Sequence, residues 1–112
     1  MLPPVISHLK NIDWLTAMRI FYWGDLDVHG FHILHQMRSY YPQTKSILMD
    51  RQTFDAFSFG IVPGERSYNK NASSLTSEER EMFEFLRSGN LRLEQEKIGQ
   101  AYADKVIREM VG

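Results

Sequence analysis

The chain has 112 residues, no cysteine and a formal net charge of −1, with 43% hydrophobic and 24% charged residues. This fits one small globular domain, argues against disorder, and excludes disulfides and thiolate metal sites. The apolar runs are too short to cross a bilayer and the N-terminus lacks a secretory pattern, so we expect a cytoplasmic protein with no membrane partner. A charge near zero excludes bulk electrostatic binding of nucleic acid, so any contact with DNA has to be local.

The first half of the chain predicts a strand, a loop, a helix and a second strand. Residues 2–16 favour one or two short helical turns. Residues 19–23, RIFYW, form an apolar run that ends at Gly24 and is typical of a strand buried on both faces. Apolar spacing predicts a helix over residues 30–41, and residues 46–49 a second strand. This βαβ order predicts parallel strands and a right-handed crossover.

The next segment predicts a short helix and a loop. Thr53 is a suitable N-cap for a helix that Gly60 closes. Residues 62–75 are rich in proline, glycine, asparagine and serine, and predict an exposed loop.

The C-terminal third predicts two helices. Thr76 and Glu79 have the spacing of a capping box that opens a helix over residues 77–88, and a last helix is predicted over residues 97–110. The expected fold is α/β, a partial parallel sheet flanked by helices. Because open α/β sheets usually hold about five or six strands, we expect the sheet to be completed from outside this chain or by homo-oligomerisation, or to be covered by the N-terminal segment.

Two aspartates follow the first predicted strand. Side chains at positions i and i+2 of an extended segment point the same way, so Asp25 and Asp27 present two carboxylates on one side while Leu26 packs inward. Ligands of open α/β sheets bind beyond the carboxyl ends of the strands, and two hard oxygen ligands there suit Mg²⁺. Gly30 allows a close approach of the following helix. The alternative is that both aspartates are turn and N-cap residues.

Further carboxylates accompany this pair. Asp50 ends the neighbouring parallel strand, at the same edge of the sheet. Arg92, Glu94 and Glu96 share one face if their segment is extended; if it is helical, Arg92 and Glu96 form an ordinary i,i+4 pair, and spacing alone leaves both open. In so acidic a site we expect at least one carboxylate to resist ionisation without metal, and Mg²⁺ to bind better at neutral than at acid pH.

Residues 22–31, YWGDLDVHGF, resemble the C-terminal Toprim domain of the JetD family, the nuclease subunit of Wadjet bacterial anti-plasmid systems. Three further stretches agree in the same order: residues 46–50 with Thr53, residues 75–76 with Glu79, and residues 92–96. Together they extend from about residue 19 to residue 98, which is most of the chain.

The resemblance implies a Toprim fold, related to that of the topoisomerase VI A subunit, and a DNA endonuclease dependent on Mg²⁺ or Mn²⁺. In such domains a DxD pair binds the metal at a DNA phosphodiester. This pair is matched by Asp25 and Asp27, the expected catalytic and metal-binding residues, with Asp50, Glu94 and Glu96 as further metal ligands. The implied partners are plasmid DNA and the SMC-like subunits of the same system.

The sequence departs from the family pattern upstream of the aspartates. The family usually carries a glutamate at the end of an earlier strand, whereas the only acidic residue before Asp25 is Asp13, in a poor context. We therefore expect residues 1–112 to be a single domain, the C-terminal part of a Toprim domain, and to be inactive alone.

Two other functions compete with a nuclease. One is a non-catalytic binding or interface module. The other is a phosphatase of the haloacid dehalogenase type, whose first motif is also a strand followed by DxD and whose first aspartate is a nucleophile. The phosphatase fits less well, because Ser46 opens the second strand rather than ending it and no suitable acidic pair follows.

Overall fold

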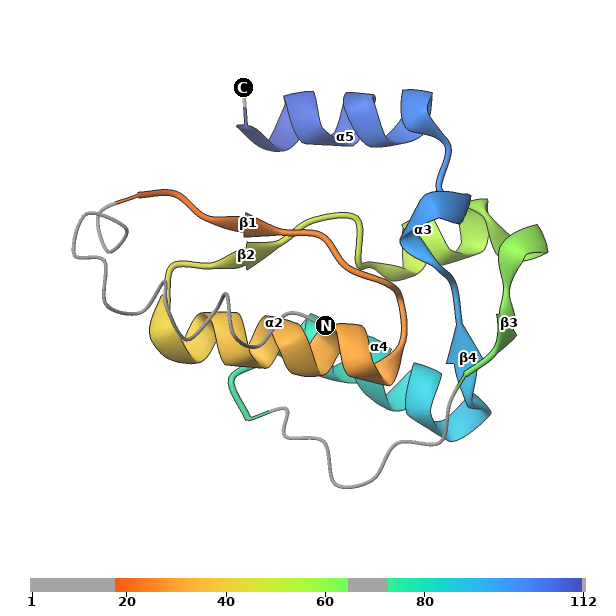
Figure 1. Cartoon of the computed structure of the whole chain (residues 1–112), viewed down its shortest axis with the longest axis horizontal. Helices are drawn as coiled ribbons and strands as arrows, with labels where there is room; N and C mark the ends of the chain where they lie inside the picture. Colours follow the sequence, from red (N-terminus) through yellow and green to blue (C-terminus); the bar gives the residue numbers. More distant parts are fainter. Residues whose placement is uncertain (1–17, 65–72, 112) are drawn as a thin grey trace.

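The computed structural model describes residues 18–64 and 73–111, which form a mixed α/β structure (Figure 1). The elements in chain order are β1 (Phe21–Tyr22), α2 (Val28–Tyr40), β2 (Lys45–Ser46), α3 (Arg51–Ala56), η2 (Ser58–Gly60), β3 (Val62–Pro63), α4 (Ser77–Gly89), β4 (Leu91–Arg92), η3 (Gln95–Lys97) and α5 (Gln100–Val111). Strands β1 and β2 pair in parallel, and β3 pairs antiparallel with β4.

The predicted parallel pair is confirmed, but it is shorter than the sequence indicates. The backbone N–H of Lys45 donates to the carbonyl of Ile20 at 2.9 Å, and that of Ile47 donates to Tyr22 at 3.0 Å. Beyond Ile47 the ladder ends, because Leu48 has a φ of 62°, a left-handed conformation that no strand contains. Within residues 18–64 and 73–111 the parallel sheet therefore has two strands.

Helix α2 begins two residues before its predicted start, because Asp27 caps it. The start of α3 also differs from the prediction. Asp50, rather than Thr53, is its N-cap, and the Asp50 carboxylate accepts the backbone N–H of Thr53 at 2.8 Å. Thr53 is instead a buried helical residue whose hydroxyl lies 3.2 Å from that of Tyr102. The predicted cap was wrong because two residues suited to that role lie three positions apart, and aspartate caps helices better than threonine.

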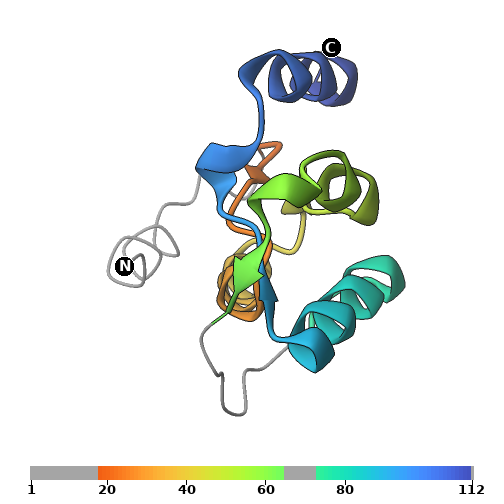
Figure 2. The same ribbon diagram turned by 90° about the vertical axis from the view of Figure 1, so that its right-hand side faces the viewer.

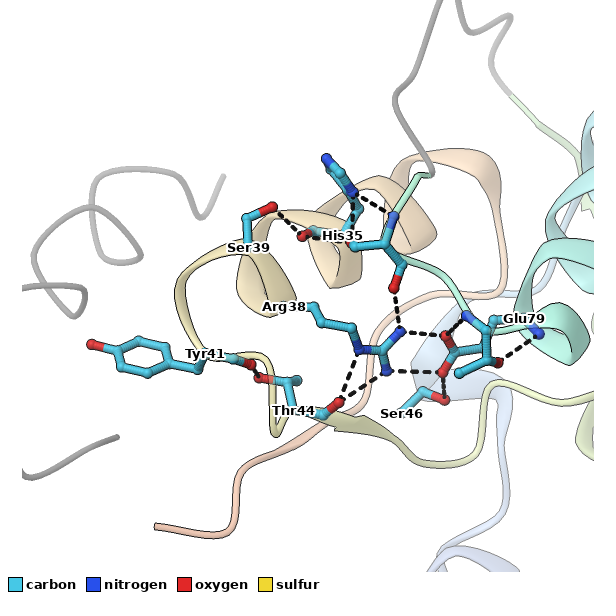
Figure 3. A network of polar contacts seen from close by, with 9 residues as sticks. His35, Arg38, Ser39, Tyr41, Thr44, Ser46 and Glu79 are labelled. Atoms are coloured by element: carbon cyan, nitrogen blue, oxygen red, sulfur yellow. Dashed lines mark hydrogen bonds and ion pairs between the residues drawn. The ribbon is translucent and has the colours of Figure 1, made fainter. Parts of the chain in front are cut away.

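The capping box of α4 is confirmed. The Thr76 hydroxyl accepts the backbone N–H of Glu79 at 3.2 Å, and the Glu79 carboxylate accepts that of Thr76 at 2.9 Å. The same carboxylate binds Arg38 of α2 through two hydrogen bonds, of 2.5 and 3.1 Å, and Ser46 of β2 through one of 2.6 Å (Figure 3). The Arg38 guanidinium also donates to the carbonyls of Thr44 and Ser74. This network fastens α2, β2 and α4 together.

The C-terminal region differs from the prediction in two places. The helix predicted over residues 97–110 begins three residues later, at Gln100 of α5, because Lys97 is the last residue of η3. The loop predicted over residues 62–75 begins instead as β3, in which Val62 lies opposite Arg92 and Pro63 opposite Leu91. Residues 65–72 of that loop, and the turns predicted in residues 2–16, lie outside the described residues.

Helices lie on both sides of the β1–β2 pair: α5 on one side, and α2 and α4 on the other (Figures 1 and 2). The core between them is apolar, and its completely buried side chains include Leu26, Phe31, Leu34, Leu86 and Leu93. Burial of such side chains is the main source of stability in a chain of this size. None of the described helices is long and apolar enough to cross a membrane.

Candidate metal site at the exit of strand β1

The site is built on a single antiparallel bridge between Leu26 and Leu93. Each residue donates its backbone N–H to the carbonyl of the other, at 2.9 and 3.0 Å, and both side chains are completely buried. Side chains alternate between the two faces of extended backbone. The residues on either side of each leucine therefore lie together on the face away from the core.

Those flanking residues form an acidic cluster around one arginine. We call Asp25, Asp27 and Glu94 the acidic cluster. The Nη2 atom of Arg92 lies 3.8 Å from Asp25 Oδ2 and 3.5 Å from Glu94 Oε2, and Arg92 Nε lies 3.5 Å from Asp27 Oδ2. The prediction that Asp25 and Asp27 share one side is confirmed. Like charges that face each other across strands are destabilising, so Arg92 offsets a repulsion that the backbone pairing creates.

The aspartates also hold backbone groups through their other oxygens. Asp27 Oδ1 accepts the N–H of Gly30 at 2.6 Å, as the N-cap of α2. Asp25 Oδ1 accepts the N–H of Gln95 at 2.7 Å, where η3 begins. The capping interpretation is thus confirmed for Asp27, and Asp25 does the same for a segment far away in the sequence. In each carboxylate Oδ1 is engaged by the backbone, while Oδ2 faces Arg92.

Burial raises the pKa of Asp27, and the charge of Asp25 raises it further; the N–H of Gly30, Arg92 and His29 act in the opposite direction. The expectation that one carboxylate resists ionisation is therefore confirmed in direction, although burial rather than like-charge repulsion is the main cause. A divalent cation would relieve both effects, because it favours the ionised form.

Tyr22 is a further residue of this region that the sequence pattern does not single out. Burial raises the pKa of its hydroxyl, and the charges of Asp25 and Asp27 add to that effect. The hydroxyl lies over Gly24: a Cβ at that glycine would stand 2.3 Å from Tyr22 Oη. A neutral phenol therefore covers the backbone between β1 and the aspartates.

The other predicted ligands lie apart from the acidic cluster. Glu96 is exposed in η3, because the turn of that 3-10 helix ends the extended segment that aligns Arg92 with Glu94. Asp50 is at the same end of the parallel sheet, where it caps α3. As they stand, residues 18–64 and 73–111 hold no group of three or more histidine, aspartate or glutamate side chains that could bind a metal ion.

The donor chemistry nevertheless fits Mg²⁺. This ion is usually held by one or two carboxylates, with waters and substrate phosphate completing its six ligands. The Oδ2 atoms of Asp25 and Asp27 both face the same guanidinium, and Glu94 Oε2 approaches it from the opposite chain segment. A fit to Mg²⁺ would therefore use two carboxylates, those of Asp25 and Asp27, with the remaining ligands supplied by water and substrate.

The sequence of this chain matches a known protein family over most of its length. Residues 4–107 match the family described as Wadjet protein JetD, C-terminal. No curated protein matches the chain in sequence. The matched range includes every residue of the acidic cluster, Arg92, Asp50 and Glu96.

Proposed function

This chain belongs to the JetD C-terminal family of Wadjet proteins, and from that premise we propose that it forms part of a Mg²⁺-dependent DNA endonuclease domain of the Toprim type. Membership in a Wadjet system suggests a role in anti-plasmid defence within a multi-protein system. The substrate we propose is plasmid DNA, and the partners are the SMC-like subunits of the same system. Mn²⁺ is the alternative metal.

The observation that carries this proposal is the approach of Asp25 and Asp27, which follow the parallel strand β1, to one positive group that Glu94 also approaches. Carboxylates at the carboxyl end of a parallel strand lie where α/β sheets bind their ligands. Their backbone hydrogen bonds fix the orientation of both aspartates before a metal arrives, which limits the entropy lost on binding.

In the proposed reaction Asp25 and Asp27 hold the metal, and Glu94 orients or completes its ligand set. When bound there, Mg²⁺ would neutralise charge on the scissile phosphate and position an attacking water. Asp50 and Glu96 are proposed as outer residues that contact metal-bound water or DNA. Tyr22, a neutral phenol at physiological pH, covers the protein side of the site through its hydroxyl over Gly24.

A non-catalytic interface module is the second candidate, and one observation favours it. Both aspartates already serve as backbone caps, and Arg92 already offsets their charge, so the cluster is explained without a metal. The two functions make different predictions for a variant that keeps the hydrogen bonds to the backbone but loses the carboxylate charge. A nuclease needs that charge to bind metal, whereas an interface module does not.

Asparagine substitutions separate these functions. Asparagine caps helices as well as aspartate does but lacks the charge, so Asp25→Asn and Asp27→Asn preserve the fold. In the full-length protein we expect Mg²⁺ binding, measured by calorimetry, and cleavage of supercoiled plasmid both to fall to background. Asp55→Asn is the matched control, because Asp55 is exposed on α3 and pairs with Arg51 at 3.0 Å, a contact between two exposed side chains.

If the double variant bound Mg²⁺ like wild type and still cut plasmid, the aspartates would be caps alone and the nuclease proposal would fail. If it lost Mg²⁺ binding while the wild-type protein itself cut no plasmid under any Mg²⁺ or Mn²⁺ condition, the interface module would be favoured. The same assays on Asp50→Asn and Glu96→Gln test the outer roles.

A further inference from the structure

Arg92 is held very differently from the other arginine that faces a buried carboxylate. Arg38 makes two direct hydrogen bonds to Glu79, and three more from the same guanidinium go to backbone carbonyls (Figure 3). Arg92 approaches three carboxylates at 3.5–3.8 Å, outside the range of an N–H···O hydrogen bond. Arg38 is held in position by direct hydrogen bonds, whereas Arg92 offsets the charge of the carboxylates through longer contacts.

The Nε atom of Arg92 is also buried and has no hydrogen-bond partner. A buried N–H donor without a hydrogen bond is costly, and because this atom is buried it gains an acceptor from outside the protein when the side chain moves. The guanidinium is a planar donor whose geometry matches the oxygens of a phosphate. Arg92 Nε therefore has an ion-pair contact of 3.5 Å to Asp27 Oδ2 but no hydrogen bond that would hold it beside the carboxylates proposed to bind metal.

The backbone on both sides of Arg92 is fixed, so only its side chain can move. Its own backbone pairs with Val62 of β3, and the next residue, Leu93, is bridged to Leu26. A divalent ion that binds the carboxylate oxygens facing Arg92 also replaces the positive charge that Arg92 supplies to the acidic cluster. The guanidinium is then repelled by the ion but stays at the rim of the site.

We propose that Arg92 is a metal-controlled phosphate-binding residue: without a divalent ion it neutralises Asp25, Asp27 and Glu94, and with the ion bound it is released to bind a DNA phosphate. This inference rests on the proposed metal-dependent function of the same site. It assigns Arg92 two successive partners, of which the carboxylates are the first and the nucleic acid backbone is the second.

The first test measures competition. Removal of the guanidinium removes a competitor for the carboxylate oxygens, so Arg92→Gln in the full-length protein is expected to bind Mg²⁺ roughly two- to fivefold more tightly, the range for a partly exposed ion pair. Arg87→Gln is the matched control, because Arg87 is exposed on α4 and pairs with Glu84. A purely structural ion pair predicts unchanged or weaker Mg²⁺ binding, and that result would overturn the inference.

The second test measures phosphate contact. Binding of a fluorescent DNA duplex is followed against salt, with Ca²⁺ in place of Mg²⁺ so that binding is separated from cleavage. One lost phosphate contact lowers the slope of log K against log salt by about 0.9. We expect Arg92→Gln to lower the slope by about that amount with Ca²⁺ but not in EDTA, and Arg92→Lys to restore it. An equal loss in both conditions, or no loss in either, contradicts metal control.

Arg92→Lys retains the charge, so it keeps the inference testable if the glutamine variant does not fold. Because its ammonium still competes with the ion, this variant is expected to bind Mg²⁺ as wild type does, and clearly tighter binding would contradict the inference. If Asp25→Asn and Asp27→Asn abolish Mg²⁺ binding while neither Arg92 variant behaves as expected, the inference fails and the proposed function stands. If wild type binds no divalent ion, both fail.

Discussion

Gly30 lies at the closest approach between the exit of β1 and the first turn of α2. A Cβ at this position would stand 2.0 Å from the carbonyl oxygen of Asp25 and 3.2 Å from Asp27 Oδ1. The obstacle is backbone, which cannot move aside as the tip of a long side chain can. The close approach that the sequence predicts at this glycine is therefore confirmed, and it sets the position of both aspartates.

We expect Gly30→Ala to lower the free energy of unfolding by about 1–3 kcal/mol, the usual cost of overpacking. Denaturant unfolding of the full-length protein measures it. Gly99→Ala is the control, since its nearest neighbours, at 3.3 and 3.4 Å, are atoms of the Phe57 ring, and it should cost less. Equal losses at the two glycines would show that the Asp25 carbonyl is not the constraint.

At the scale of residues, local rules predict that the two aspartates share one side, but they do not predict that Arg92 is their counterion. The i, i+2 rule places Asp25 and Asp27 on one side, and the structure confirms it. The partner of Asp25 in η3 is 70 positions away in the chain, and no local pattern specifies such a pairing. The alternation of Leu91, Arg92 and Leu93 was compatible with both strand and helix, so the role of Arg92 required the fold.

At the scale of elements, Glu79 joins three segments of the chain. Burial alone would raise its pKa, but hydrogen bonds from Arg38, Ser46 and the Thr76 backbone outweigh that effect and hold the pKa below its usual value of 4.5. Because the folded state lowers this pKa, the ionised carboxylate stabilises the fold above the ordinary glutamate pKa, and that stability is lost as the pH falls through the folded value.

Glu79→Gln keeps a side chain that fits a capping box but removes the charge. We expect it to lower the free energy of unfolding by about 1.5–3 kcal/mol at pH 7, the usual contribution of a hydrogen bond to a charged group. The difference from wild type should shrink as the pH falls below about 4, as measured by urea unfolding at a series of pH values.

Glu84→Gln provides the matched control on the same helix. Its ion pair with Arg87 is about half exposed, so we expect a change within about 0.5 kcal/mol. A difference between Glu79→Gln and wild type that stayed constant with pH would mean that the charge of Glu79 is not what links the three segments.

Helices were easier to predict than strands in this chain. Helix caps and apolar spacing are local, so α2 and α4 begin and end within two residues of their predicted limits. Strands depend on a partner, and β1 and β2 each pair over two residues only. Strand β3 was missed because Pro63 and the residues after it are typical of a loop, although proline is tolerated in an edge strand.

At the scale of the whole molecule, the Leu26–Leu93 bridge connects the first half of the described chain to the last third. Leu93→Ala should lower the free energy of unfolding by about 2–5 kcal/mol, the cost of truncating a completely buried leucine. It should also weaken Mg²⁺ binding, because the acidic cluster is assembled across this bridge. Calorimetry and denaturant unfolding of the full-length protein measure the two effects.

Leu75→Ala distinguishes loss of stability from loss of the site. Leu75 is buried ahead of α4 and belongs to the same core, so its truncation should also destabilise the protein. Mg²⁺ binding by the folded Leu75→Ala protein should remain at the wild-type level. Equal weakening in both variants would mean that general stability, rather than the bridge, controls the site.

The whole molecule also exposes surface that suits association. In the part of the chain that the structure describes, the parallel sheet has two strands, and the side chain of Phe59 is 80% exposed. Because unpaired strand edges and exposed aromatic side chains favour contact with another chain, we expect the full-length protein to self-associate. Sedimentation velocity over a range of concentrations should show this, and Phe59→Ser should shift the distribution toward smaller species. Wild type that stays monomeric at every concentration would contradict the expectation.

The bridge between Leu26 and Leu93 also affects when the site forms during folding and synthesis. Closing the loop of about 70 residues between the two leucines costs entropy that later contacts have to repay, so we expect this bridge to form late in folding. During synthesis α2 and the aspartates leave the ribosome well before the segment that carries Arg92 and Glu94. A nascent chain therefore holds Asp25 and Asp27 before Arg92 and Glu94 are present, and the complete acidic cluster exists only once translation has passed Glu94.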